Sequence, residues 1–92
     1  MNGLGERLKL ARLASGISQQ VLADRVALSC SAIKNYETGY SDPRLEWAAK
    51  LAEALGVSLN WLVYGNHPPQ ADRELMAKLI HYERKREVRT NG

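Results

Sequence analysis

Apolar side chains recur along this chain at the spacing of helices that bury one side. The pattern predicts five helices within residues 1–65, and we therefore expect an all-α fold. The first is expected over residues 5–15, with Gly16 as a left-handed residue after it. The residues predicted to face the core are Leu4, Leu8, Ala11 and Leu13 in the first helix, Val21, Leu22, Ala23 and Val26 in the second, Ile33 in the third, Leu45, Ala48, Ala49, Leu51, Ala52 and Leu55 in the fourth, and Leu59, Trp61, Leu62 and Val63 in the fifth.

Polar residues precede the predicted helices at the positions of N-caps. Ser18, Ser29 and Ser58 each carry a hydroxyl that can accept a hydrogen bond from a backbone N–H one turn on. Asp42 and Pro43 are expected to cap and start the fourth helix. The second and third helices are then joined by a tight turn at Ala27–Leu28.

The third helix carries an apolar anchor on one side and polar residues on the other. Measured around the helix from Ile33, at about 100° per residue, Lys34 lies near 100°, and Thr38, Ser31 and Asn35 lie between about 140° and 200°. A helix docked through Ile33 would present these four side chains to a partner.

This arrangement resembles the helix-turn-helix of phage repressors, Cro proteins and the wider XRE-type bacterial regulators. The resemblance covers about residues 4–65. The matching residues within the motif are Gln19, Leu22-Ala23, Ile33, Glu37 and Gly39, and those beyond it are Pro43, Leu51-Ala52, Leu55-Gly56-Val57-Ser58, Asn60-Trp61-Leu62 and Gly65. In that family the first motif helix crosses the DNA backbone and the second lies in the major groove.

The resemblance implies a sequence-specific regulator of transcription, of the (pro)phage repressor type, that binds double-stranded DNA without a cofactor. Residues implied to contact the DNA backbone are Ser18, Gln19, Ser29, Tyr40, Ser41 and Arg44. Residues implied to face base edges are Cys30, Ser31, Lys34 and Asn35. Asn35 suits an adenine edge and Lys34 suits guanine acceptors.

A charged residue, Arg12, stands among the apolar residues of the first helix. The resemblance implies a structural ion pair between Arg12 and Glu37. The alternative is an Arg12 solvated at the edge of the apolar side, and we favour the pair because lone charges at core-facing positions are costly.

Ala27 departs from the family pattern, which usually has glycine in this turn. Glycine suits a positive φ, and alanine there is expected to cost about 1 kcal/mol. The alanine affects the expected shape of the turn, and so the angle between the two motif helices, but not the identification of the motif.

Residues 66–70 form a proline-containing hinge, and residues 71–92 form a tail with a basic end. The tail is predicted to be an amphipathic helix whose apolar face comprises Leu75, Met76, Leu79, Ile80 and Tyr82. This face is expected either to form a homodimer or to fold back on the domain's own core. An antitoxin-like regulator, whose tail would bind a protein partner, is the alternative to a repressor.

The composition excludes several classes of protein and site but does not by itself indicate a function. Net charge is +3, of which residues 1–65 contribute only +1, so DNA binding would need its charge on one face. The absence of a long apolar run and of a charged, then apolar leader favours a cytoplasmic protein without a membrane span. A single cysteine, Cys30, forms no internal disulfide or metal site, and it is either a small groove-facing residue or a redox sensor. No phosphate loop, metal-ligand spacing or nucleophile motif indicates an enzyme.

Overall fold

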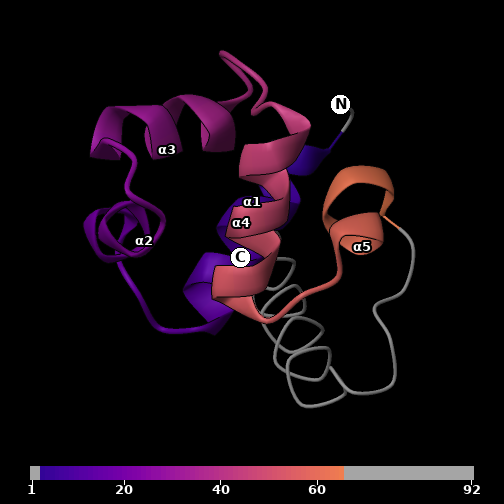
Figure 1. Cartoon of the computed structure of the whole chain (residues 1–92), viewed down its shortest axis with the longest axis horizontal. Coiled ribbons are helices and arrows are strands. Elements are labelled where there is room, and N and C mark those ends of the chain that lie inside the picture. The colour runs from indigo at the N-terminus through magenta and orange to yellow at the C-terminus, as the bar shows by residue number, and fades with distance from the viewer. Residues whose placement is uncertain (1–2, 66–92) are drawn as a thin grey trace, which may run out of the picture.

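The computed structural model describes residues 3–65, which form five helices and no strand (Figure 1). The helices are α1 (Leu4–Ala14), α2 (Gln19–Val26), α3 (Cys30–Thr38), α4 (Leu45–Leu55) and α5 (Leu59–Tyr64). The all-α prediction is thus confirmed for this part of the chain. The predicted hinge, the tail helix and its apolar face lie outside the described residues.

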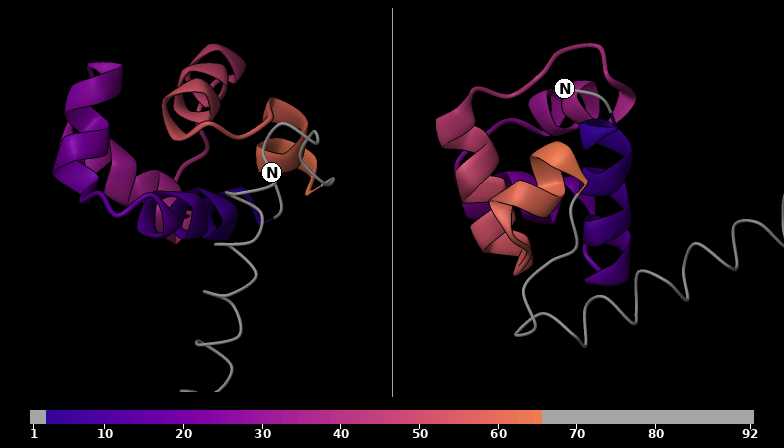
Figure 2. Two further views of the ribbon diagram at one scale, coloured as in Figure 1. Left: turned by 90° about the horizontal axis from the view of Figure 1, so that it is seen from below. Right: turned by 90° about the vertical axis from the view of Figure 1, so that its right-hand side faces the viewer.

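Two central helices, α1 and α4, separate the motif helices from the last helix. Figures 1 and 2 show α2 and α3 on one side of this pair and α5 on the other. The largest fully buried side chains come from all five helices: Leu4, Leu8, Leu22, Ile33, Leu51 and Leu62. The motif is therefore held by a core to which every described helix contributes.

Four residues predicted to face the core do not lie in it, and a fifth, Leu59, is half-buried against it. Leu13 is half-buried, Val21 is 40% exposed, Leu45 is 66% exposed, and Ala49 is exposed. Leu13, Val21 and Ala49 lie about 100° to 160° around from a fully buried residue of the same helix, whereas Leu45, the first residue of α4, lies only about 60° from Ala48. Helical spacing located the buried stripes but not their width, because it included these residues and omitted Leu10, which is 6% exposed.

The serine caps are confirmed, and the predicted start of the fourth helix is wrong. Ser18, Ser29 and Ser58 each accept from the backbone N–H three residues on, at 3.1, 3.1 and 3.0 Å. Pro43 is instead buried in the loop before α4, and Arg44 holds the N-cap position with an extended ψ of 157°. The loop consequently includes Arg44 and α4 begins at Leu45.

Gly5 allows α1 to approach the end of α3 closely. A Cβ atom at this position would collide with the backbone carbonyl oxygen of Tyr36 and would lie 2.7 Å from that of Glu37. Any larger residue would push α1 away from α3, so glycine is required here by packing rather than by its backbone angles.

Arg7 ties the first helix to the end of the last one. Its Nε donates to the Leu62 carbonyl and its Nη2 to the Val63 carbonyl, both at 2.9 Å. These carbonyls belong to the last turn of α5, where intrahelical partners run out and a cation is favoured. Burial lowers the pKa of the Arg7 guanidinium, and the Glu6 carboxylate opposes that shift.

Ala27 ends α2 in the left-handed conformation, with φ 58° and ψ 40°, and no other non-glycine residue among those described has a positive φ. This agrees with the positive φ predicted from the family's usual glycine. We expect Ala27→Gly to raise the free energy of unfolding by about 0.5–1 kcal/mol, because glycine adopts this conformation without a Cβ penalty.

The measurement is a denaturant titration of both proteins. Ala49→Gly is the control, because Ala49 is exposed inside α4 and glycine there should destabilise by about 1 kcal/mol. A lower denaturation midpoint for Ala27→Gly would contradict the strain assigned to this turn.

None of the helices in residues 3–65 has the length and apolar character needed to cross a bilayer.

Candidate nucleic-acid interface

The third helix packs on the domain through Ile33 and Glu37 and leaves its other sides exposed. Ile33 is fully buried, whereas Ser31, Lys34 and Thr38 are exposed and Asn35 is half-buried. Cys30, the first residue of α3, is half-buried with a free thiol. The structure thus places the four predicted base-facing residues on one helix, with the longer two, Lys34 and Asn35, one turn beyond the shorter two.

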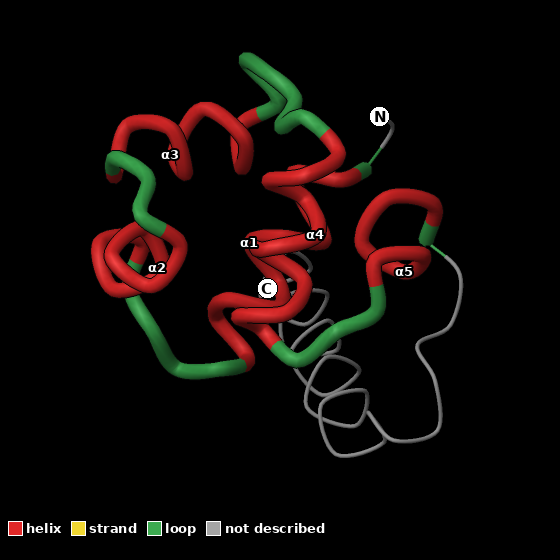
Figure 3. The backbone as a smooth tube through the Cα atoms, viewed as in Figure 1, coloured by secondary structure: helices red, strands yellow, loops and turns green. Residues whose placement is uncertain are grey.

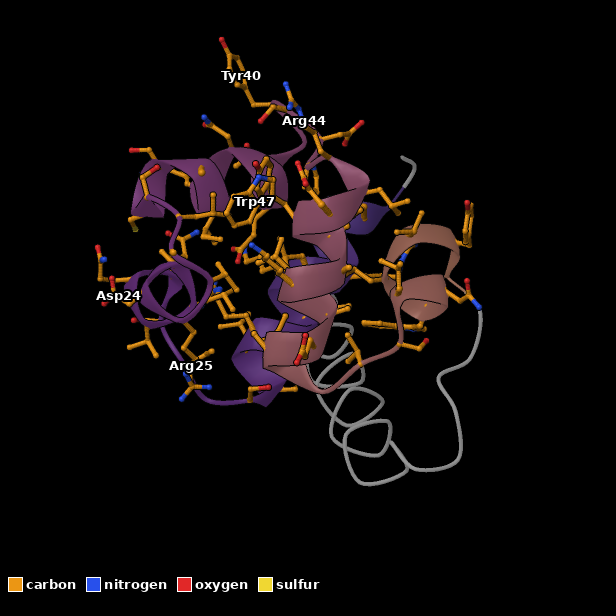
Figure 4. All side chains as sticks on the ribbon, viewed as in Figure 1. Asp24, Arg25, Tyr40, Arg44 and Trp47 are labelled. Atoms are coloured by element: carbon orange, nitrogen blue, oxygen red, sulfur yellow. The ribbon has the colours of Figure 1, made fainter. Side chains whose placement is uncertain are left out.

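A loop leaves the end of α3 and leads to α4 (Figure 3). The Ser41 backbone N–H donates to the Asn35 carbonyl at 3.3 Å, and the Thr38 hydroxyl donates to the same carbonyl at 3.3 Å. Tyr40 and Arg44 project from this loop past the end of α3 (Figure 4), and the Tyr40 side chain is 83% exposed. Three predicted backbone contacts, Tyr40, Ser41 and Arg44, therefore lie together.

The remaining predicted backbone contacts stand at the starts of α2 and α3. The hydroxyl oxygens of Ser18 and Ser29 each accept from their own helix, which leaves each hydroxyl hydrogen available to donate. Gln19 is half-buried and follows Ser18 as the first residue of α2. The first N–H groups of a helix have no intrahelical acceptor and favour an anion.

A buried ion pair, Arg12–Glu37, joins α1 to α3. Arg12 donates from Nε to Glu37 Oε2 at 2.6 Å and from Nη2 to Glu37 Oε1 at 3.0 Å, and the two side chains are 9% and 2% exposed. The Arg12 Nη1 also donates to the Ile17 carbonyl at 3.0 Å. The solvated alternative for Arg12 is thereby excluded, and α1 is joined directly to the end of α3.

Sequence reasoning missed two contacts near this surface. Gln19 Nε2 donates to Glu37 Oε1 at 3.1 Å, and on the exposed side of α2, Gln20 Nε2 donates to Asp24 Oδ1 at 2.9 Å. The i,i+4 spacing of Gln20 and Asp24 is a signal that could have indicated their contact. No local signal links Gln19 to Glu37, because their proximity depends on the packing of α2 against α3.

The exposed cations of residues 3–65 are spread over several elements, with Lys9 on α1, Arg25 on α2, Lys34 on α3, Arg44 before α4 and Lys50 on α4. The Lys50 ammonium lies 4.4 Å from the ring centroid of the half-buried Trp47 on α4. Within residues 3–65 no cluster of three or more His, Cys, Asp or Glu side chains could hold a metal ion.

A comparison with known proteins also identifies a helix-turn-helix in this part of the chain. The helix-turn-helix family model (HTH_3) matches residues 8–62, which include all of α2, α3 and α4. No solved structure matches the chain significantly.

Three curated relatives are named as regulators or repressors. The SPbeta prophage-derived uncharacterized HTH-type transcriptional regulator YonR of Bacillus subtilis is 41% identical over 63 residues, covering 68% of this chain and 58% of its own length. The cryptic phage CTXphi transcriptional repressor RstR of Vibrio cholerae is 35% identical over 74 residues, covering 80% of this chain and 65% of its own. The repressor protein CI of Enterobacteria phage phi80 is 31% identical over 74 residues, covering 80% of this chain and 31% of its own.

The chain therefore spans less than two thirds of each of these relatives. The family match, by contrast, covers more than half of the chain and includes the motif with its packing helices. The chain belongs to the helix-turn-helix family of the phage-repressor, or XRE, type.

Proposed function

We propose that this chain binds a specific double-stranded DNA operator and represses transcription there. The observation that carries the proposal is the structure of α3, in which Ile33 is fully buried while Ser31, on the opposite side, and Lys34, about 100° around from Ile33, are exposed. A helix of this kind suits the major groove, where side chains can reach base edges. The names of the relatives, which include two repressors, support the same function.

The interface divides into two classes of contact. Cys30, Ser31, Lys34 and Asn35 face the bases, and the starts of α2 and α3 with the loop before α4 hold the phosphates. Because Cys30 and Ser31 are short, direct reading of bases is concentrated on Lys34 and Asn35. The shape of the DNA and bridging water then contribute the rest of the specificity.

The protein acts in this proposal as a cytoplasmic homodimer. A domain with nearly neutral charge gains little from general attraction to phosphates, and a twofold pair of motifs doubles the number of specific contacts. The sequence-based proposal for the dimer contact is the apolar face of residues 71–83. The antitoxin alternative gains no support from the relatives, which are named as regulators and repressors.

Selection of bound sites from a pool of random duplexes tests this function. We expect one enriched sequence with two inverted half-sites whose centres lie about 34–36 Å apart, one turn of DNA. Lys34→Ala combined with Asn35→Ala is the control and should enrich a different or weaker consensus. A pool that remains random would contradict the function, and a single half-site without symmetry would contradict the dimer alone.

A further inference from the structure

One carboxylate gathers hydrogen bonds from two other helices at the edge of the interface. Glu37, in the last turn of α3, accepts from Arg12 at both oxygens and from the Gln19 amide nitrogen at Oε1. Arg12 belongs to α1 and Gln19 begins α2. The three side chains therefore connect the end of α3 to the start of α2 and to α1.

The chemistry of the carboxylate fixes the orientation of the Gln19 amide. An ionised carboxylate only accepts hydrogen bonds, so the nitrogen of the amide and not its oxygen must face Glu37. That nitrogen carries a second N–H, and the half-buried Gln19 side chain is not enclosed by the protein. One N–H of the Gln19 amide thus donates to Glu37, and this hydrogen bond also fixes the direction of the second N–H.

We propose that Glu37 is a positioning residue for DNA binding, which holds the Gln19 amide ready to donate its second N–H to a phosphate. This inference rests on the proposed function, because it assigns a partner to a residue of that interface. A free glutamine side chain loses rotamer freedom when it binds, and holding it in advance removes that cost from the association. The buried Arg12 in turn fixes Glu37 through two hydrogen bonds.

The chain offers a matched control in the next residue. Gln20 also donates its amide nitrogen to a carboxylate, that of Asp24, at 2.9 Å, but this pair is exposed and belongs to α2 alone. Gln20 shares the chemistry of Gln19 and lacks the link to the buried pair.

The experiment removes the carboxylate while keeping the protein folded. Replacing a buried ion pair by apolar residues of similar size is often neutral or stabilising, so Arg12→Met combined with Glu37→Met serves as the background. Affinity for the selected operator is measured in this background and in the unaltered chain, each with and without Gln19→Ala. Gln20→Ala is made in both as the control.

We expect Gln19→Ala to weaken operator binding by about tenfold in the unaltered chain and by less than about twofold in the Met–Met background. Gln20→Ala should have the same small effect in both. An equal loss from Gln19→Ala in the two backgrounds would overturn the proposal, since Glu37 would then act only on the fold.

Changing the DNA in place of the protein distinguishes an effect of Glu37 on the Gln19 contact from an effect of Glu37 on the stability of the fold. Single phosphates of the operator are replaced by uncharged methylphosphonates, and the one whose replacement weakens the unaltered chain but not Gln19→Ala identifies the contact. The Met–Met protein should be insensitive at that phosphate. Retained sensitivity there, at lower overall affinity, would contradict the proposal.

NMR relaxation of the side-chain amides can be measured in the unaltered chain without DNA. This test needs no variant, so its result does not depend on whether a variant folds. The Gln19 side-chain amide should be rigid, with an order parameter of about 0.8, and the order parameter of the Gln20 amide should be lower. Equal mobility of the two amides would overturn the inference while leaving DNA binding intact. A chain that binds no duplex would instead overturn the proposed function.

Discussion

Replacing Glu37 by alanine is expected to lower the free energy of unfolding by about 3–5 kcal/mol, because it leaves the Arg12 guanidinium buried without its counter-charge. The Glu37 side chain is 2% exposed and that of Arg12 is 9% exposed, so water cannot readily replace the lost hydrogen bonds. The loss is a large fraction of the stability that a domain of this size has.

Denaturant titration measures this effect, with Glu53→Ala as the matched control. Glu53 is exposed on α4, and its removal should change stability by no more than about 0.5 kcal/mol. Arg12→Met in the Glu37→Met background should restore much of the stability that Glu37→Met alone removes. Equal costs for Glu37→Ala and Glu53→Ala would show that the pair contributes no more than a surface contact.

The second large effect is expected on sequence preference. Asn35→Ala should lose about 1–3 kcal/mol of binding against the preferred operator and change which base is favoured at one position of each half-site. Asn35 is half-buried on the uncovered side of α3, and its backbone carbonyl is already held by Thr38 and Ser41, so the substitution removes the amide without releasing the loop. Competition between the operator and its single-base variants measures the change.

Arg44→Ala is the contrasting variant, because Arg44 lies in the loop before α4 and is assigned to a phosphate. It should weaken all duplexes alike and reduce the salt dependence of binding by about one unit. If Asn35→Ala left the base preference unchanged, α3 would not be the element that reads the groove.

Much of this architecture could be predicted because it depends on local chemistry. Ser18, Ser29 and Ser58 cap helices through atoms only three residues away, and such spacing is visible in the sequence. Ile33 is the only large aliphatic side chain in α3, which made its burial predictable. The Arg12–Glu37 pair was expected only because the chain resembles a known family.

Features that depend on how helices meet could not be predicted. Leu45 is 66% exposed at the first position of α4, and whether another helix covers that position is not encoded in the pattern of α4 alone. The need for glycine at position 5 is not visible in the sequence, because it arises from the carbonyl groups at the end of α3 that pack against it. The Gln19–Glu37 contact spans 18 residues and likewise needs the packed motif.

The contact of Arg7 with α5 joins the first described helix to the last, and this limits when the contact can form during synthesis. Its guanidinium bonds carbonyls that lie 55 and 56 residues further along the chain. During synthesis, which proceeds from the N-terminus, Arg7 emerges from the ribosome long before Leu62 and Val63 exist. The motif helices are complete while this arginine still lacks those acceptors, so the hydrogen bonds that join α1 to α5 can form only after the fifth helix has been translated.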